Sequence, residues 1–393
     1  MTIEMLTPNI GTGAMEDRER VDYRSLRAAR HDRVTALMDR LGLDALMLGR
    51  EANVRYSSGA RRLWTASSRP FGPTCVVVRA TGRVHLMTFS ASYEGAPEEV
   101  PFEDVFCNSF NPGKLLDALL AIPGLGTADR IGVDGFSVFM RDFLPNAVPH
   151  ATFVGVGHDL QQLRRHKLPA EIDTMRIAIS IAESSIYAAA REVRPGVTEK
   201  SLQAAYLDRM CTLGTSQFAQ QGTFTVIAPD GAIRWITGEG ERAVLADGDL
   251  VVLAGGALWA GYEGSLARTW CSGASTAVQR DLHERWQGVV DALVTAARPG
   301  ATGVDLVAAH EAAGEPIPPM PIAYSVGLGH EGAIAGTALG ASFDREQRID
   351  AGTVVALRTH VRGSTGGYFG EEMVYVGEDK TELLTTLGHC FPL

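Results

Sequence analysis

Side chains suited to moving protons or binding an anion gather in the last third of the chain. Arg358 and His360 stand two residues apart in a β-rich run, so the two-residue period of a strand puts them on one face. Glu371 and Glu372 open a second such run, and His330 follows a Gly-Leu turn. Histidine changes charge near neutral pH, and an arginine fork binds carboxylates. The set predicts acid–base chemistry on a small anionic molecule or, as an equal alternative, an Arg–Glu pair that only fills space.

The elements that must position these residues differ between the two halves of the chain. The first half alternates helical and strand patterns, and Ala80-Thr81-Gly82-Arg83 marks a hairpin-like turn. We expect helices at residues 31–41 and 115–121 and strands at 44–48, 74–79, 84–88 and 130–133. In the second half, long helices are expected at 170–193 and 278–297, each ended by an Arg-Pro-Gly turn, and a helix from Val197 to about Leu213.

The repeated Arg-Pro-Gly-x-Thr turn predicts that the second half is internally duplicated. Each copy is expected to carry an antiparallel strand pair. The pairs are Leu250–Leu253 with Ala257–Trp259, and Val354–Leu357 with Met373–Val376. Helices covering one face of an antiparallel sheet give an α+β architecture.

Composition excludes several classes of partner. The chain has 393 residues and a net charge of −10, without a Lys/Arg-rich run, which argues against a nucleic-acid surface. No apolar stretch approaches the ~20 residues that span a bilayer, and no secretion signal is visible. The five cysteines are scattered without a CxxC pair, which is typical of reduced thiols in a cytoplasmic protein. Residues 1–22 are polar and unpatterned, and we expect a loose arm there.

Several motifs, in order, resemble the creatinase/aminopeptidase P family. They are Asn53–Gly59, Arg164–Ile172, both Arg-Pro-Gly turns, the Gly248–Val252 strand and Glu371–Val376. The resemblance implies a creatinase-like α/β N-terminal domain at 23–162 and a "pita-bread" α+β domain at 163–393. It also implies a homodimer in which the N-terminal domain of one subunit reaches the active site of the other.

Metallopeptidases of this family bind two divalent ions through two Asp, one His and two Glu. Carried onto this chain, those positions fall on Ala254, Ser265, Tyr324, Arg358 and Glu371, with Glu372 in place of Glu371 if the register slips by one. Alanine offers no ligand, neutral hydroxyls are poor ligands, and arginine is a permanent cation. We therefore expect no bound metal, no other cofactor and no aminopeptidase activity.

The resemblance also assigns roles to residues around the vacated positions. His330 matches a second family His that handles protons or holds substrate, although the gap before it is one residue shorter. It is the first candidate for general acid/base. His360 is the second. Trp235 replaces the substrate His that creatinase uses as acid/base, so creatine hydrolysis is not expected. Its indole suggests substrate binding by stacking on an apolar or planar group. Arg61 and Trp64 stand where family members offer residues to the partner's site.

Each of these residues also has a plain structural alternative: a hydrogen-bonded loop His, a Trp that plugs an unused pocket, or a solvated surface pair.

The favoured hypothesis is a metal-independent hydrolase or lyase for a small carboxylate-bearing substrate. In it, Glu371 moves protons, and Arg358, Tyr324 and Ser265 line the pocket. The other hypothesis is a non-catalytic pseudo-peptidase that binds a ligand or a protein. Cyclisation or C–C cleavage cannot be distinguished from hydrolysis by sequence.

Overall fold

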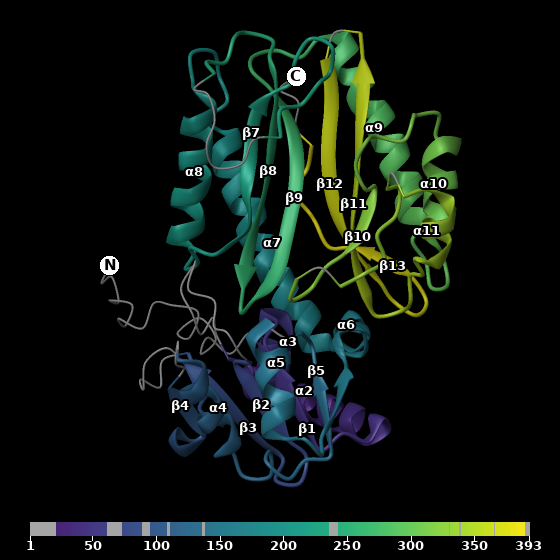
Figure 1. The fold of residues 1–393 in the computed structure, drawn as a ribbon. Coiled ribbons are helices and arrows are strands. Elements are labelled where there is room, and N and C mark those ends of the chain that lie inside the picture. The colour runs from purple at the N-terminus through teal and green to yellow at the C-terminus, as the bar shows by residue number, and fades with distance from the viewer. Residues whose placement is uncertain are drawn as a thin grey trace. The chain divides into compact units, whose positions relative to one another are not determined.

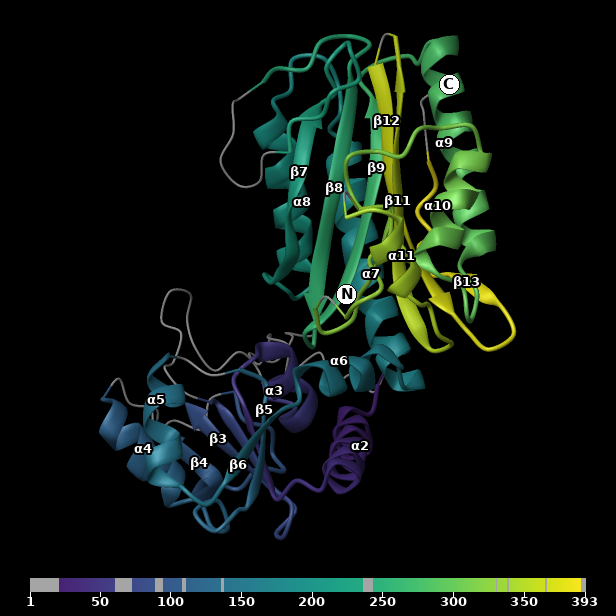
Figure 2. The same cartoon turned by 45° about the vertical axis from the view of Figure 1, so that its right-hand side comes forward.

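The structure, a computed structural model, describes residues 21–60, 73–88, 95–107, 111–135, 138–235, 243–329, 331–337, 339–364 and 366–389. It contains two compact units, one formed by Asp22–Arg164 and the other containing Arg165–Leu393 (Figures 1 and 2). Within the described ranges, no helix is both long and apolar enough to cross a membrane.

The first unit is a mixed six-stranded sheet with helices packed on it. The strand order is β4-β3-β2-β1-β5-β6, in which β1, β2 and β3 are antiparallel neighbours and the other pairings are parallel. The strands are β1 (Ala45–Leu48), β2 (Cys75–Val78), β3 (Arg83–Thr88), β4 (Val105–Cys107), β5 (Arg130–Val133) and β6 (Thr152–Gly155). The helices are α2 (Tyr23–Leu41), α3 (Glu51–Ser58), α4 (Pro112–Leu120), α5 (Val138–Ala147) and α6 (Gly157–Arg165), with a 3-10 turn at Phe102–Asp104. The α/β N-terminal domain expected from the sequence is confirmed.

The second unit is an antiparallel sheet with the order β10-β11-β12-β9-β8-β7 and with β13 beside β12. The strands are β7 (Phe218–Val226), β8 (Leu250–Trp259), β9 (Tyr262–Cys271), β10 (Ala323–Ser325), β11 (Thr353–Gly363), β12 (Gly366–Val376) and β13 (Thr381–Leu383). The helices are α7 (Pro169–Ala190), α8 (Glu199–Thr212), α9 (Ala277–Ala296), α10 (Gly303–Ala312) and α11 (Ala341–Glu346). Helix α7 packs on β8 and β9, and α9 packs on β11 and β12 (Figure 2). The predicted α+β architecture is confirmed.

The two Arg-Pro-Gly turns make the same pair of backbone hydrogen bonds, as expected if the second unit is internally duplicated. Gly196 N donates to Leu245 O at 2.8 Å, and Gly300 N donates to Ile349 O at 2.7 Å. In return, Leu245 N donates to Val197 O and Ile349 N donates to Ala301 O, both at 2.8 Å. Every residue of the second turn follows its counterpart by the same number of positions. Both glycines have a φ of 85°, which only glycine adopts without strain.

One expected strand pair is wrong. Leu250–Leu253 and Ala257–Trp259 are not partners, because both belong to the single strand β8. The chain turns instead between Trp259 and Tyr262, and β8 pairs with β9 along its whole length. Gly255 and Gly256 lie between the two expected strands but are themselves strand residues: a Cβ at Gly255 would meet the Tyr206 ring, and one at Gly256 would meet Ser265.

Helix α9 shows how the sequence sets one of these covering elements. It is capped by Thr276, whose hydroxyl accepts from Gln279 N at 3.2 Å, while the Gln279 side chain accepts from Thr276 N at 2.9 Å. This reciprocal capping satisfies two amide groups at the start of the helix. Its buried residues recur at three- and four-residue intervals and face the sheet: Leu282, Trp286, Val289, Val290 and Leu293.

Two glycines allow the helices to lie close against the sheet. A Cβ at Gly264 in β9 would overlap the backbone of Ala178 and Ile179 in α7. A Cβ at Gly370 in β12 would overlap the Trp286 ring in α9. The even-numbered residues of both strands therefore face the helices, and their odd-numbered neighbours face the other side of the sheet.

We predict that Gly264→Ala destabilises the protein by about 3 kcal/mol, because the added methyl group meets helix backbone that cannot rotate away. Gly288→Ala is the matched control, since Gly288 lies inside α9 with open space around a Cβ. It should stabilise by about 0.5–1 kcal/mol. Urea unfolding of the two variants measures both effects, and equal stability of G264A and wild type would contradict the close packing.

Candidate active site

Side chains from four strands meet on the sheet face that points away from α7 and α9. Glu371 on β12 is the register partner of Arg358 on β11 and of Ala267 on β9. Ser265 lies two residues from Ala267, and Tyr324 comes from β10, the neighbour of β11. The predicted site residues Ser265, Tyr324, Arg358 and Glu371 are therefore brought together by strand register.

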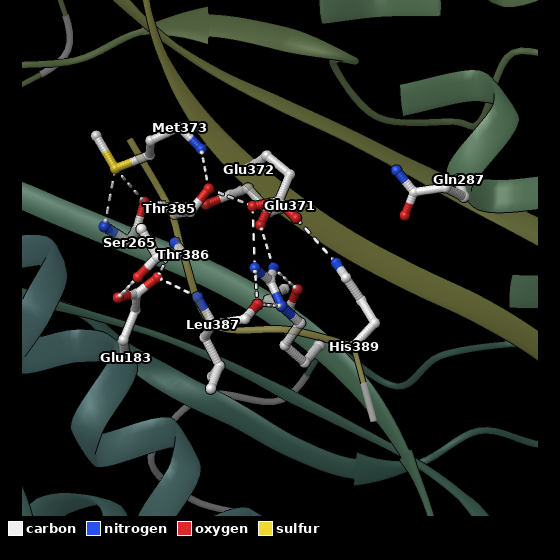
Figure 3. Close-up of polar contacts among 12 residues, drawn as sticks. Glu183, Ser265, Gln287, Glu371, Glu372, Met373, Thr385, Thr386, Leu387 and His389 are labelled. Carbon is white, nitrogen blue, oxygen red and sulfur yellow. Dashed lines mark hydrogen bonds and ion pairs between the residues drawn. The ribbon is translucent and has the colours of Figure 1, made fainter. Parts of the chain in front are cut away.

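The carboxylate of Glu371 is the centre of this group. Ser265 Oγ donates to its Oε1 at 2.9 Å (Figure 3). The Tyr324 hydroxyl donates to its Oε2, also at 2.9 Å. Arg358 Nη1 lies 3.7 Å from Oε2. Glu371 is only 3% exposed, and these three groups replace the water that its charge loses on burial.

Arg358 is held by more than this one contact. Its Nε donates to Pro321 O at 2.8 Å, and its guanidinium carbon lies 4.7 Å from the centre of the Tyr324 ring, a cation–π contact. With one nitrogen near one oxygen of Glu371, the pair is not the bidentate fork considered from the sequence. In the described part of the chain Nη2 has no protein acceptor, and the side chain is 21% exposed. Arg358 thus keeps a donor for an anion.

Tyr324 acts as a hydrogen-bond donor at every physiological pH. Burial, followed by the negative charge of Glu371, raises the pKa of its phenol well above the usual value. The hydroxyl therefore stays protonated and donates to Glu371.

A second ion pair, which the sequence did not single out, lies in the same unit. Lys167 Nζ pairs with Glu331 Oε2, and both side chains are buried. Leu328 N donates to Glu331 Oε1 at 3.1 Å. A Cβ at Gly327 would overlap the Glu331 carboxylate, so glycine leaves the space that this pair occupies.

Glu263 is a further carboxyl group that the sequence reasoning missed. It lies two residues before Ser265 on β9 and thus shares its face. Burial raises the pKa of Glu263 to about 7, and the charges of Glu371 and Glu331 add to the rise. Applying the two-residue period outward from Ser265 would have found it.

Two other predicted residues sit with Phe369 instead of Glu371. The Trp235 ring meets the Phe369 ring edge-on at 4.8 Å and is 45% exposed, and the His360 ring lies 6.4 Å from Phe369. Burial, with the nearby charge of Arg362, lowers the pKa of His360 to about 4. His360 is therefore neutral at pH 7. His330, Arg61 and Trp64 lie outside the described residues.

Glu372 faces the opposite side of the sheet from Glu371. Its carboxylate accepts from His389 Nε2 at 2.9 Å and from the Thr385 hydroxyl (Figure 3). It also accepts from Arg268 Nη2 at 3.0 Å. Arg268 Nη1 also donates to the backbone oxygen of Glu371 at 2.9 Å. The register thus directs Glu371, and not Glu372, toward Ser265 and Tyr324.

The ligand chemistry of this face is mixed. Ala254, the register partner of Ala267, contributes only a methyl group beside one carboxylate, two hydroxyls and a guanidinium. Among the residues that the structure describes, no three His, Cys, Asp or Glu side chains lie together in a way that would hold a metal ion.

The sequence matches two protein families. Residues 173–378 match Metallopeptidase family M24, and residues 30–166 match the Creatinase/Prolidase N-terminal domain. A Xaa-Pro dipeptidase of Pyrococcus furiosus is 26% identical over 281 residues, which cover 70% of this chain and 74% of that protein. An uncharacterized hydrolase/peptidase of Sinorhizobium fredii is 25% identical over 297 residues, covering 68% and 71%.

Solved structures share the fold. The prolidase of Pyrococcus horikoshii superposes with a TM-score of 0.74 at 20% identity, covering 92% of this chain and 99% of its own. The X-Pro aminopeptidase of Thermotoga maritima gives a TM-score of 0.71 at 19% identity, covering 90% and 98%. The fold expected from the sequence is confirmed by these matches.

The raised pKa of Glu263 predicts a pH-dependent stability difference between wild type and Glu263→Gln. A raised folded-state pKa gives stability that is present below the unfolded pKa and is lost as pH rises to about 7. E263Q lacks this loss, so between pH 5 and pH 8 it should gain about 1–2 kcal/mol on wild type, allowing for partial exposure. Thermal unfolding at both pH values measures it. Glu378→Gln, in an exposed turn, is the control; equal pH profiles of E263Q and wild type would contradict the prediction.

Proposed function

The chain belongs to metallopeptidase family M24, and within that family we propose a metal-independent enzyme that cleaves a small carboxylate-bearing substrate by hydrolysis or elimination. The observation that carries the proposal is the Glu371 carboxylate, which accepts from Ser265 and Tyr324 and lies beside Arg358.

The side chains at this place do not fit a divalent metal. Both oxygens of Glu371 already accept hydrogen bonds, and the neutral hydroxyls of Ser265 and Tyr324 are weak ligands. Arg358 is a permanent cation whose charge repels a metal ion. In the resemblance to creatinase and aminopeptidase P, these positions and Ala254 carry the metal ligands. We therefore derive no step through a metal.

Arg358 supplies the anion-binding function in this proposal. Its Nη2 keeps a donor, while Pro321 O and the Tyr324 ring hold the guanidinium in one orientation. A substrate carboxylate would form a charge-assisted hydrogen bond there. Several relatives are named Xaa-Pro dipeptidases, and a dipeptide carries such a carboxylate at its C-terminus.

Proton transfer is assigned to Glu371 and His330. Glu371, whose carboxylate accepts from Ser265 and Tyr324 and lies beside Arg358, is assigned the role of base. His330, which directly precedes the buried Glu331 in the sequence, is retained as the acid/base candidate from the sequence. We also propose the homodimer that the resemblance implies, with Arg61 and Trp64 contributed to the partner's site.

A non-catalytic ligand-binding protein is the second candidate. It is favoured by the fact that both oxygens of Glu371 already accept hydrogen bonds from the protein's own side chains. In that case Ser265, Tyr324 and Arg358 would serve only to stabilise a buried charge.

We predict that Arg358→Ala weakens the binding of small carboxylates by about 10- to 100-fold, the effect of losing one charge-assisted hydrogen bond. Calorimetry with a panel of carboxylates, each paired with its amide, measures this. Arg348→Ala, which removes an equal charge from an exposed position, should leave binding unchanged. If no carboxylate binds better than its amide, Arg358 is not an anion site.

The two candidate functions separate in turnover assays with the carboxylates that bind. An enzyme should lose turnover in His330→Ala and in Arg358→Ala while both variants keep the wild-type circular dichroism spectrum. A binding protein shows no turnover before or after either substitution.

A further inference from the structure

Three carboxyl groups lie at or near the proposed site, and the charges of two of them are compensated by cations and hydrogen-bond donors. Glu371 receives two hydroxyl donors and lies beside Arg358. Glu331 is paired with the buried Lys167 and accepts from a backbone amide. Glu263 has no cation and no hydrogen-bond donor to its carboxyl group among the described residues. A carboxyl group without compensation beside two anions is the one that keeps its proton.

The backbone around Glu263 fixes where this group lies. Glu263 N donates to Gly327 O at 2.8 Å, which ties β9 to the segment that carries Glu331. The next residue, Gly264, packs directly against the backbone of α7. Ser265, one position further, holds Glu371. Glu263 is therefore a fixed neighbour of the site, presented by the same strand that positions Ser265.

We propose that Glu263 supplies the proton to the leaving group of the substrate, a role separate from that of His330, and that it works opposite the carboxylate of Glu371. The inference rests on the proposed function. The bond between a substrate carbon and its leaving atom breaks, and the leaving atom takes the proton of Glu263, whose Oε–H electron pair stays on the carboxylate. Glu371 takes a proton from the attacking water in hydrolysis, or from the adjacent carbon in elimination, so that a C–O or a C=C bond forms. After product release, the proton on Glu371 returns through solvent to Glu263. Two carboxyl groups with different surroundings thus divide the work of acid and base.

The surrounding charges support this assignment. The anions that act on Glu263 are Glu371 from β12 and Glu331 from the loop after β10, and together with burial they raise its pKa to about 7. Tyr324 from β10 also faces Glu263 but stays neutral. Arg358 and Lys167 each lie with one of the two anions, so neither offsets the burial of Glu263. At neutral pH a substantial fraction of Glu263 is protonated.

The proton on Glu263 can be observed without knowing the substrate. Protein labelled with ¹³C at the glutamate side-chain carboxyl is titrated by NMR between pH 5 and pH 9. We expect one carboxyl resonance with a midpoint near 7, absent from Glu263→Gln and unchanged in Glu378→Gln. In Glu371→Gln the midpoint should fall by about one pH unit, because a neighbouring anion is removed. This second variant keeps the test decisive if E263Q does not fold.

The inference is overturned if no glutamate titrates between pH 6 and pH 8, or if the resonance that does is unaltered in both E263Q and E371Q. With a carboxylate that turns over, E263Q should lower kcat by about 100-fold or more with little change in KM, whereas Arg358→Lys should act mainly on KM. Turnover with an unchanged kcat in E263Q would refute only the role of Glu263. A protein that binds and converts no carboxylate would refute the proposed function itself.

Discussion

The need to compensate one buried carboxylate, that of Glu371, determines which side chains lie on the sheet face that points away from α7 and α9. An ionised group that is 3% exposed is unfavourable unless hydrogen bonds and opposite charge replace its water. Here the compensation comes from Ser265 on β9, Tyr324 on β10 and Arg358 on β11. Each donor arrives from a different strand, so the register of the whole sheet is a condition for the site.

The strand that carries Glu371 is also held by contacts on the opposite face of the sheet. Arg268 donates to the backbone oxygen of Glu371 and to the side chain of Glu372. Its Nη2 and Nε also donate to Leu387 O, at 2.7 and 3.0 Å. Glu183 binds the amides of Thr386 and Leu387 in turn (Figure 3). The C-terminal segment and the proposed site are thus joined through a single strand, β12.

The sequence predicted the residues of the site better than their arrangement. The period-two pattern was sufficient for β1, β2, β3, β5 and parts of β8, β11 and β12, and the Arg-Pro-Gly repeat for the duplicated turns, because both are local signals. The strands β4, β6, β7, β9, β10 and β13 were not predicted from this pattern. The pattern could not show that Gly255 and Gly256 continue β8, since that depends on Tyr206 and Ser265 lying against them. Nor could it choose between Glu371 and Glu372, because a one-residue shift of register exchanges the two faces.

Charges brought together across long stretches of sequence escaped prediction. Lys167 and Glu331 meet only after folding, and the unusual pKa of Glu263 arises from burial and from neighbours on other elements. Local composition carries no information on burial or on charges from distant parts of the sequence. The two-residue period of β9, applied outward from Ser265, would have identified Glu263 as a neighbour. His330, the first candidate from the sequence, lies outside the described residues and stays a prediction.

We propose that Ser265, Tyr324 and Arg358 replace a metal site by two hydrogen bonds and an ion pair to Glu371, while Ala254 offers no ligand. Calorimetric titration with Mn²⁺, comparing wild type with the variant A254D/S265D/Y324H/R358E, tests it most directly. The wild type should bind no Mn²⁺, and the variant, which restores oxygen ligands and one imidazole, should bind about two ions per chain. Uptake of one or two ions by the wild-type protein would contradict the account.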